Sequence, residues 1–261
     1  MHELPLVFFT VLAQASVGVF VLMTLLTLLK KATPEQMDKA ALISFVLIVV
    51  AGFSAVFHLG QPFRAFNALF GAGRSPMSNE ILICGIFGAC VFVYVASKYV
   101  SWISQGLKTI ISVLATLSGI ALVLTIPEVY QLNSVPTWDT PITSLQLILT
   151  AFICGGAIAT SLTKHTFGCF VSCLGILVML AVSPSYFAFL SQAGGSVIGA
   201  DSVFWGIKYV LLAIGFMLLV LYCSKSETLT NPRLAYIASV LFIVAEVAGR
   251  IGFYDLWAIG M

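Results

Sequence analysis

Residues 4–29 read LPLVFFTVLAQASVGVFVLMTLLTLL and contain no charged side chain. About 20 mostly apolar residues are enough for an α-helix to cross the hydrocarbon core of a bilayer. Seven more segments of this kind follow, roughly at residues 40–58, 79–99, 107–129, 142–161, 166–190, 203–222 and 233–256. The sequence therefore predicts an all-α fold, a polytopic membrane bundle of about eight transmembrane helices.

The composition places the whole chain in a membrane. Of its 261 residues, 60% are hydrophobic and 8% are charged, and the mean hydropathy is +1.09. A typical soluble domain is about 45–50% apolar and about 25% charged, so no soluble core could bury this much apolar surface. The connections between the segments are short, and residues 1–261 are expected to form a single integral membrane domain. A net charge of +2 without a basic cluster argues against a nucleic-acid partner. The apolar composition predicts membrane lipid as the surroundings of the chain.

The chain starts with Met1-His2-Glu3 and no basic segment, which predicts a retained first helix in place of a cleaved signal peptide. Lys and Arg are enriched in the cytoplasmic loops of membrane proteins. The connections after the odd-numbered segments hold Lys30, Lys31, Lys39, Lys98, Lys108, Lys164, Lys225 and Arg233, and the other side holds Arg64, Arg74, Lys208 and Arg250. This distribution predicts that both termini face outward, which is the periplasm for a multi-pass protein of the bacterial inner (plasma) membrane.

The densest polar cluster lies between the second and third segments, in residues 58–80 (HLGQPFRAFNALFGAGRSPMSNE). A glycine and a proline soon follow His58 and are expected to end its helix, which leaves the imidazole at the membrane edge. Ser78 or Asn79 is expected to cap the next helix, with Glu80 in the first turn. Ionisable groups at membrane depth are costly in free energy and usually functional. We therefore predict the functional site on the side of the membrane where this cluster lies.

Two interpretations of the cluster stay open. In the structural one, Arg64 and Glu80 form an ion pair and His58 caps its helix. In the functional one, His58 hydrogen-bonds a ligand and Glu80 accepts a proton, with Arg64 raising the local positive potential. A quinol suits this environment, because its tail belongs in lipid and its head group needs a polar, proton-accepting pocket. The candidate pocket contains His58, Arg64, Asn67, Ser78, Asn79 and Glu80, and its catalytic residues are His58 and Glu80.

The sequence argues against a redox metal bound by this protein. Two b-type haems in a helical bundle need four axial histidines, and the sequence has His2, His58 and His165. A single haem between His2 and His58 is disfavoured, because neither lies inside a helix at a depth that would bury the macrocycle. The six cysteines form no C-x-x-C pair and are expected to pack as small apolar side chains. We therefore expect no metal site, haem or iron–sulfur cluster here.

Three other features predict packing. Glu246 and Arg250 are four residues apart in one segment, a spacing that permits an intrahelical ion pair. The adjacent glycines Gly155 and Gly156 allow two membrane helices to approach closely. Trp138 follows an apolar segment and suggests an aromatic anchor at the membrane interface.

Several motifs together resemble the membrane anchor of anaerobic dimethyl sulfoxide reductase, over nearly the whole sequence. The motifs are His2-Glu3 with Pro5-Leu6, His58-Leu59-Gly60 with Pro62, Arg64-Ala65 and Asn67, Ser78-Asn79-Glu80-Ile81, Val129-Tyr130, Val135-Pro136-Thr137-Trp138, and Gly249-Arg250 with Phe253-Tyr254. Two positions depart from the family pattern: Leu4 stands where a tryptophan is frequent, and Asp139-Thr140-Pro141 replaces a more apolar stretch.

This resemblance implies a heterotrimer for anaerobic respiration. Its partners are a molybdopterin catalytic subunit and an iron–sulfur subunit with [4Fe–4S] clusters, and this chain is the anchor and menaquinol-oxidising subunit. His58 and Glu80 match the positions associated with menaquinol. Electron transport then runs from menaquinol to the iron–sulfur subunit and on to a sulfoxide or N-oxide, so the chain is not expected to be an enzyme alone.

Two alternatives remain. A purely structural anchor would hold the redox partners and bind no quinol. A small secondary transporter would carry its site near mid-membrane on broken helices, whereas the polar residues here gather at one membrane edge.

Overall fold

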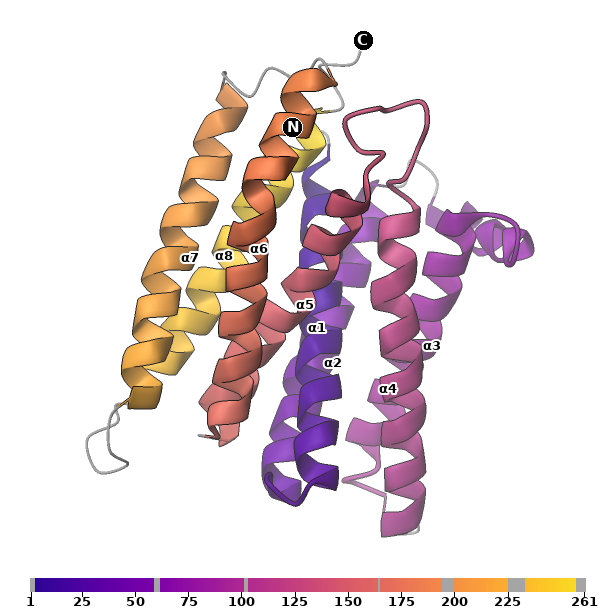
Figure 1. Cartoon of the computed structure of the whole chain (residues 1–261). Helices are drawn as coiled ribbons and strands as arrows, with labels where there is room; N and C mark the ends of the chain where they lie inside the picture. Colours follow the sequence, from indigo (N-terminus) through magenta and orange to yellow (C-terminus); the bar gives the residue numbers. More distant parts are fainter. Residues whose placement is uncertain are drawn as a thin grey trace.

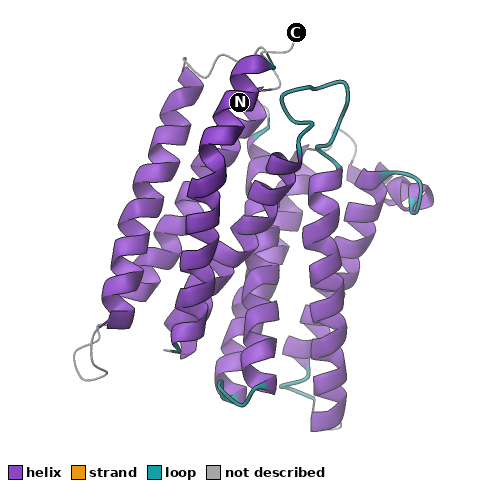
Figure 2. Cartoon of the chain, viewed as in Figure 1, coloured by secondary structure: helices purple, strands orange, loops and turns teal. Residues whose placement is uncertain are grey.

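The computed structural model describes residues 3–58, 62–100, 103–163, 165–193, 200–224 and 233–256, without the side chains of residues 58, 62–66 and 200–202. Within these ranges the protein forms eight α-helices and one 3-10 helix. The described residues form no strand, as Figure 2 shows. The elements are α1 (Leu4–Leu28), α2 (Pro34–His58), η1 (Pro62–Gly71), α3 (Pro76–Ala96), α4 (Gln105–Glu128), α5 (Pro141–Thr163), α6 (Thr166–Gln192), α7 (Ala200–Ser224) and α8 (Arg233–Asp255) (Figure 1).

All eight α-helices are long and apolar enough to cross a membrane. The prediction of an all-α bundle with about eight spanning helices is therefore confirmed. Two helices begin earlier than hydropathy suggests, α2 at Pro34 and α3 at Pro76. Proline suits the first helical position, because its fixed φ matches the helix and its missing N–H is not needed there. The polar residues that follow each proline are helical but lower the local hydropathy.

Helix α1 is the centre of the bundle and contacts α2, α4, α5 and α8 (Figure 1). Most of its side chains are buried, from Val7 to Leu26. Its crossing with α5 is very close: a Cβ on Gly18 would lie 2.0 Å from the carbonyl oxygen of Ala151. A Cβ on Gly155 would lie 2.4 Å from the carbonyl carbon of Gly18. These contacts confirm the packing role predicted for the glycine pair of α5.

The outer helices present apolar side chains to their surroundings. Phe53 on α2, Phe170 on α6 and Met217 on α7 are each more than 60% exposed, at 63%, 62% and 65%. A soluble protein rarely exposes so many large apolar side chains together. Lipid is the solvent that accommodates this surface, in agreement with the membrane assignment.

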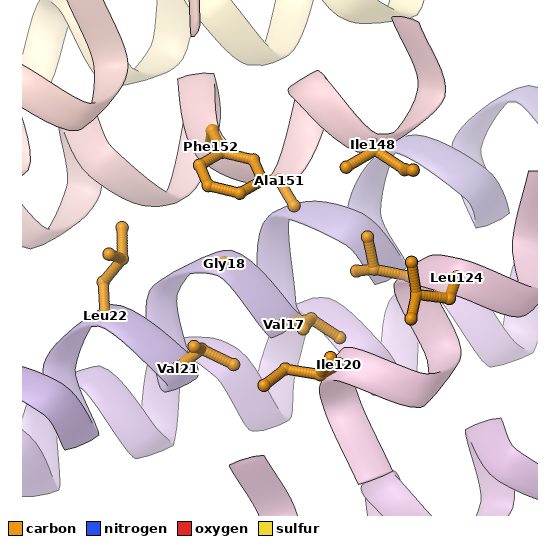
Figure 3. Close-up of a pocket in the computed structure, with 10 residues that line it drawn as sticks. Val17, Gly18, Val21, Leu22, Ile120, Leu124, Ile148, Ala151 and Phe152 are labelled. Carbon is orange, nitrogen blue, oxygen red and sulfur yellow. The ribbon is translucent and has the colours of Figure 1, made fainter. Parts of the chain in front are cut away.

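An apolar cavity of about 170 Å³ opens between α1, α4 and α5 (Figure 3). Val17, Gly18 and Val21 line it from α1, and Ile120, Leu124, Ala151 and Phe152 are among the residues that close it from the other two helices. All the lining residues are apolar, so the cavity offers no group for proton chemistry.

Candidate quinol site and its surroundings

Successive helices alternate in direction, so α1, α3, α5 and α7 begin at the same face of the bundle at which α2, α4, α6 and α8 end (Figure 1). We call this the N-terminal face. Element η1 lies there, between the end of α2 and the start of α3. The predicted site residues therefore belong to one face, as the sequence indicated.

Glu80 is the buried acid of this face. It is the fifth residue of α3 and only 6% exposed, one turn deeper than the predicted first-turn position. Its Oε1 atom is buried and has no hydrogen-bond partner among the described residues. The hydroxyls of Tyr130 and Tyr254 lie within electrostatic range of its side chain. A buried carboxylate oxygen without a partner is energetically costly, which makes Glu80 a candidate functional residue.

The predicted cap of α3 was wrong. Ser75, in an extended conformation, is the N-cap, and Pro76 follows at the start of the helix. Ser78 is instead buried against η1, where its Oγ atom lies 2.6 Å from the position of a Cβ on Gly71. Asn79 uses its Oδ1 atom to accept a 2.6 Å hydrogen bond from the backbone N–H of Gly73. Both side chains thus hold the η1–α3 connection in place.

Two site residues, His58 and Arg64, are placed only in part. The backbone puts His58 at the last residue of α2 and Arg64 inside η1, but their side chains lie outside the described residues. The predicted Arg64–Glu80 ion pair and the predicted His58 contacts therefore stay predictions. Asn67 is exposed on η1.

An aromatic cluster beside Glu80 was not predicted. Tyr130, just after α4, and Tyr254, near the end of α8, join their hydroxyls in a 2.5 Å hydrogen bond. Trp138 stacks on Phe253 at 5.0 Å between ring centroids, and its Nε1 atom donates to the Phe253 carbonyl at 3.0 Å. Trp138 is only 5% exposed, so the predicted interfacial anchor was wrong. Three motifs from different parts of the sequence therefore meet in space: Val135-Pro136-Thr137-Trp138, Val129-Tyr130 and Phe253-Tyr254. Their spacing in the sequence does not reveal this contact.

A second buried polar group lies deeper among α1, α5, α7 and α8. Glu246 pairs with Lys208 of α7, with 3.4 Å between Oε2 and Nζ, and no ion pair within 4.0 Å joins it to Arg250 in the described structure. The predicted intrahelical pair was therefore wrong. Arg250 extends its Nη2 atom to Gln14 Oε1 at 3.0 Å and to Thr150 Oγ1 at 3.1 Å. Thr150 in turn donates to Glu246 Oε2 at 2.8 Å, so it links the two charges indirectly.

The described residues contain no group of three or more His, Cys, Asp or Glu side chains that could hold a metal ion. The six cysteines are free thiols. Neither finding tests whether the protein binds haem or an iron–sulfur cluster. The expected absence of both stays a prediction.

Membrane-length helices joined by short connections, with buried charges gathered toward one face, define a multi-pass integral membrane protein. Comparison with protein-family models gives the family. The model of the DMSO reductase anchor subunit (DmsC) matches residues 1–256, so the chain belongs to this family and is a membrane anchor subunit.

Individual relatives agree with this assignment. The protein is 28% identical to an anaerobic dimethyl sulfoxide reductase chain of Haemophilus influenzae, with 98% of this sequence and 95% of the relative covered. It is 29% identical to an anaerobic dimethyl sulfoxide reductase chain of Escherichia coli over the same shares. A sulfite dehydrogenase subunit of Allochromatium vinosum is 24% identical over 61% of this sequence and 54% of that protein. The resemblance inferred from the sequence motifs is confirmed.

Proposed function

We propose that this protein anchors a dimethyl sulfoxide reductase-like molybdoenzyme in the bacterial inner membrane and oxidises menaquinol at its N-terminal face. The observation that carries the proposal is the buried carboxylate of Glu80, near the end of a membrane-spanning helix. Its side chain is 6% exposed, and its Oε1 atom has no hydrogen-bond partner among the described residues. A purely structural anchor has no need of a buried, unpartnered acid, which costs stability.

The chemistry requires proton acceptors at the membrane edge. Oxidation of one menaquinol to menaquinone releases two protons and two electrons. Glu80 accepts a proton from the head group, and His58 hydrogen-bonds the head group and exchanges protons near neutral pH. Arg64 supplies positive potential that favours a developing quinolate.

The remaining pocket residues position this pair. Asn79 fixes the η1–α3 connection through its bond to Gly73, and buried Ser78 packs against η1. Asn67 is exposed on η1, and we assign it to the mouth of the proposed pocket. The quinol enters from lipid beside α2 and α3, whose outer surfaces are apolar, as exposed Phe57 and Leu82 illustrate.

The electrons leave for a partner subunit. Relatives named as chains of anaerobic dimethyl sulfoxide reductase match nearly the whole sequence. We therefore place an iron–sulfur subunit with [4Fe–4S] clusters against the N-terminal face, because electron transfer needs proximity to the quinol. The third member of the heterotrimer is a molybdopterin catalytic subunit, which reduces a sulfoxide or N-oxide in anaerobic respiration.

The test uses the intact complex and two electron donors, menaquinol and an artificial dye that bypasses the membrane site. Glu80→Gln keeps the shape of the side chain but removes the proton acceptor, and should lower menaquinol-dependent turnover about 100-fold with dye-dependent turnover unchanged. Glu128→Gln is the matched control, because Glu128 is an exposed acid at the end of α4 on the same face. Equal menaquinol turnover in both variants would leave the protein as a structural anchor only.

A further inference from the structure

The deeper polar group of the bundle borders a small cavity between α5, α6, α7 and α8. The cavity has a volume of about 20 Å³. Its polar walls include Thr143 and Gln146 of α5, Tyr186 of α6, Lys208 of α7, and Glu246 and Arg250 of α8. One water molecule needs about 10–15 Å³ of such space and two to four polar partners. The cavity is therefore the size of a single water.

Four lining side chains have a polar atom without a hydrogen-bond partner among the described residues. These atoms are Thr143 Oγ1, Gln146 Nε2, Glu246 Oε1 and Arg250 Nη1. The side chains are 2%, 8%, 1% and 4% exposed, so each is almost completely shielded from bulk solvent. Buried polar atoms in folded proteins nearly always have a partner, either protein or ordered water. The four unpartnered atoms and the cavity point to the same ligand.

We propose that this cavity binds one ordered water molecule, held by Gln146, Glu246 and Arg250. In this arrangement the water accepts hydrogen bonds from Arg250 Nη1 and Gln146 Nε2 and donates one to Glu246 Oε1. Thr150 already joins the other two atoms of the pair, Glu246 Oε2 and Arg250 Nη2. The water completes a ring in which Glu246 and Arg250 are bridged on both sides.

The mixture of donors and acceptors selects water over a small anion. Two cations, Lys208 and Arg250, and one anion, Glu246, line the cavity. This net positive charge by itself would favour a chloride ion over water. An anion, however, cannot donate a hydrogen bond, so it would leave Glu246 Oε1 unpartnered and repel it. Water satisfies the carboxylate oxygen and both donors at once.

The bridge also has a structural consequence for the N-terminal face. Arg250 interacts electrostatically with Tyr130 and Tyr254, the tyrosine pair beside Glu80. A water that fixes the Nη1 side of the guanidinium, together with Gln14 and Thr150 on the Nη2 side, holds this positive charge in one place.

The test is a map of the intact complex, in lipid nanodiscs, at a resolution that shows ordered water. We expect one peak within about 2.7–3.2 Å of Gln146 Nε2, Glu246 Oε1 and Arg250 Nη1. An empty cavity, in a map that shows other buried waters, overturns the proposal. So does a peak that exchanges for bromide in a sample prepared with that salt, which identifies an anion.

A pair of variants tests the assignment of the bonds. Gln146→Met keeps the length of the side chain and removes its donor, and should remove or strongly weaken the peak. Gln131→Met is the matched control, because Gln131 donates to Ser144 in an exposed connection away from the cavity and should leave the peak unchanged. A peak of full strength in Gln146→Met overturns the proposed binding set. If Gln146→Met fails to fold, the wild-type map still decides.

Discussion

The hydroxyl oxygens of Tyr130 and Tyr254 lie 2.5 Å apart and join the end of α4 to the end of α8, across 124 residues of sequence. Both side chains are buried, at 5% and 4% exposure. If one of the two hydroxyls were removed, the other would lose this hydrogen-bond partner in an apolar environment. Their hydrogen bond therefore ties the wall of the proposed quinol site to the helix that carries Arg250.

The tyrosine bond predicts a non-additive mutational cycle. Tyr254→Phe leaves the Tyr130 hydroxyl buried and without this partner, at a cost of about 1–3 kcal/mol. Replacing both tyrosines by Phe removes both polar atoms and should cost less than the sum of the single changes. Thermal unfolding of the purified complex measures all three variants. Additive effects would show that the two hydroxyls do not depend on each other.

His58→Arg is predicted to abolish menaquinol-dependent turnover while dye-dependent turnover and complex assembly persist. The reason is the proposed hydrogen bond from the imidazole to the quinol head group, which a permanently charged guanidinium does not reproduce as a proton acceptor. Turnover of the purified complex with each donor is the measurement. Unchanged turnover with both donors would mean that quinol is oxidised elsewhere or not at all by this protein.

The charges around Glu246 predict an asymmetry between two variants. Glu246→Gln leaves Lys208 and Arg250 as two buried cations without an anion, and should destabilise the protein by about 3–5 kcal/mol. Lys208→Met keeps the length of the side chain and leaves one cation and one anion, linked through Thr150, so it should cost clearly less. Melting temperature and the yield of assembled complex compare the two. The reverse order would contradict this charge balance.

The crossing of α1 and α5 predicts a severe effect of a single methyl group. Gly18→Ala would bring its Cβ to 2.0 Å from the carbonyl oxygen of Ala151, so the helices must move apart. We expect a loss of about 1–3 kcal/mol or more, seen as a lower melting temperature. Gly85→Ala on α3 is the control, since no atom lies within 4 Å of that position. Equal melting temperatures would show that the crossing is not tightly packed.

The distribution of Lys and Arg predicts that the N-terminal face is periplasmic. Asn133→Cys, in the exposed connection after α4, should react with a membrane-impermeant thiol reagent added to cells with a permeabilised outer membrane. Lys31→Cys, on the opposite face, should react only after the inner membrane is opened. The parent protein, whose native cysteines are free, gives the background labelling. The opposite labelling pattern would reverse the proposed topology.

Several features of the protein could be predicted from local sequence. Each spanning helix is visible because its own run of apolar residues must reach across the bilayer, whatever its neighbours are. The family was also recognisable, because its motifs are read directly from the sequence. The helix starts at Pro34 and Pro76 were missed because hydropathy does not distinguish a polar first turn from a loop.

Only the tertiary structure decided which buried polar side chains pair with each other. The sequence suggested that Glu246 pairs with Arg250, yet its cation is Lys208, 38 residues away on α7. Similarly, Tyr130 and Tyr254 meet only because the ends of α4 and α8 are neighbours in the bundle. The length of an apolar run determines that a helix crosses the membrane, but lipid accommodates almost any rotation or arrangement of such helices equally well. Close packing at points such as Gly18 against Ala151, together with the need to satisfy every buried charge, selects the arrangement that is formed.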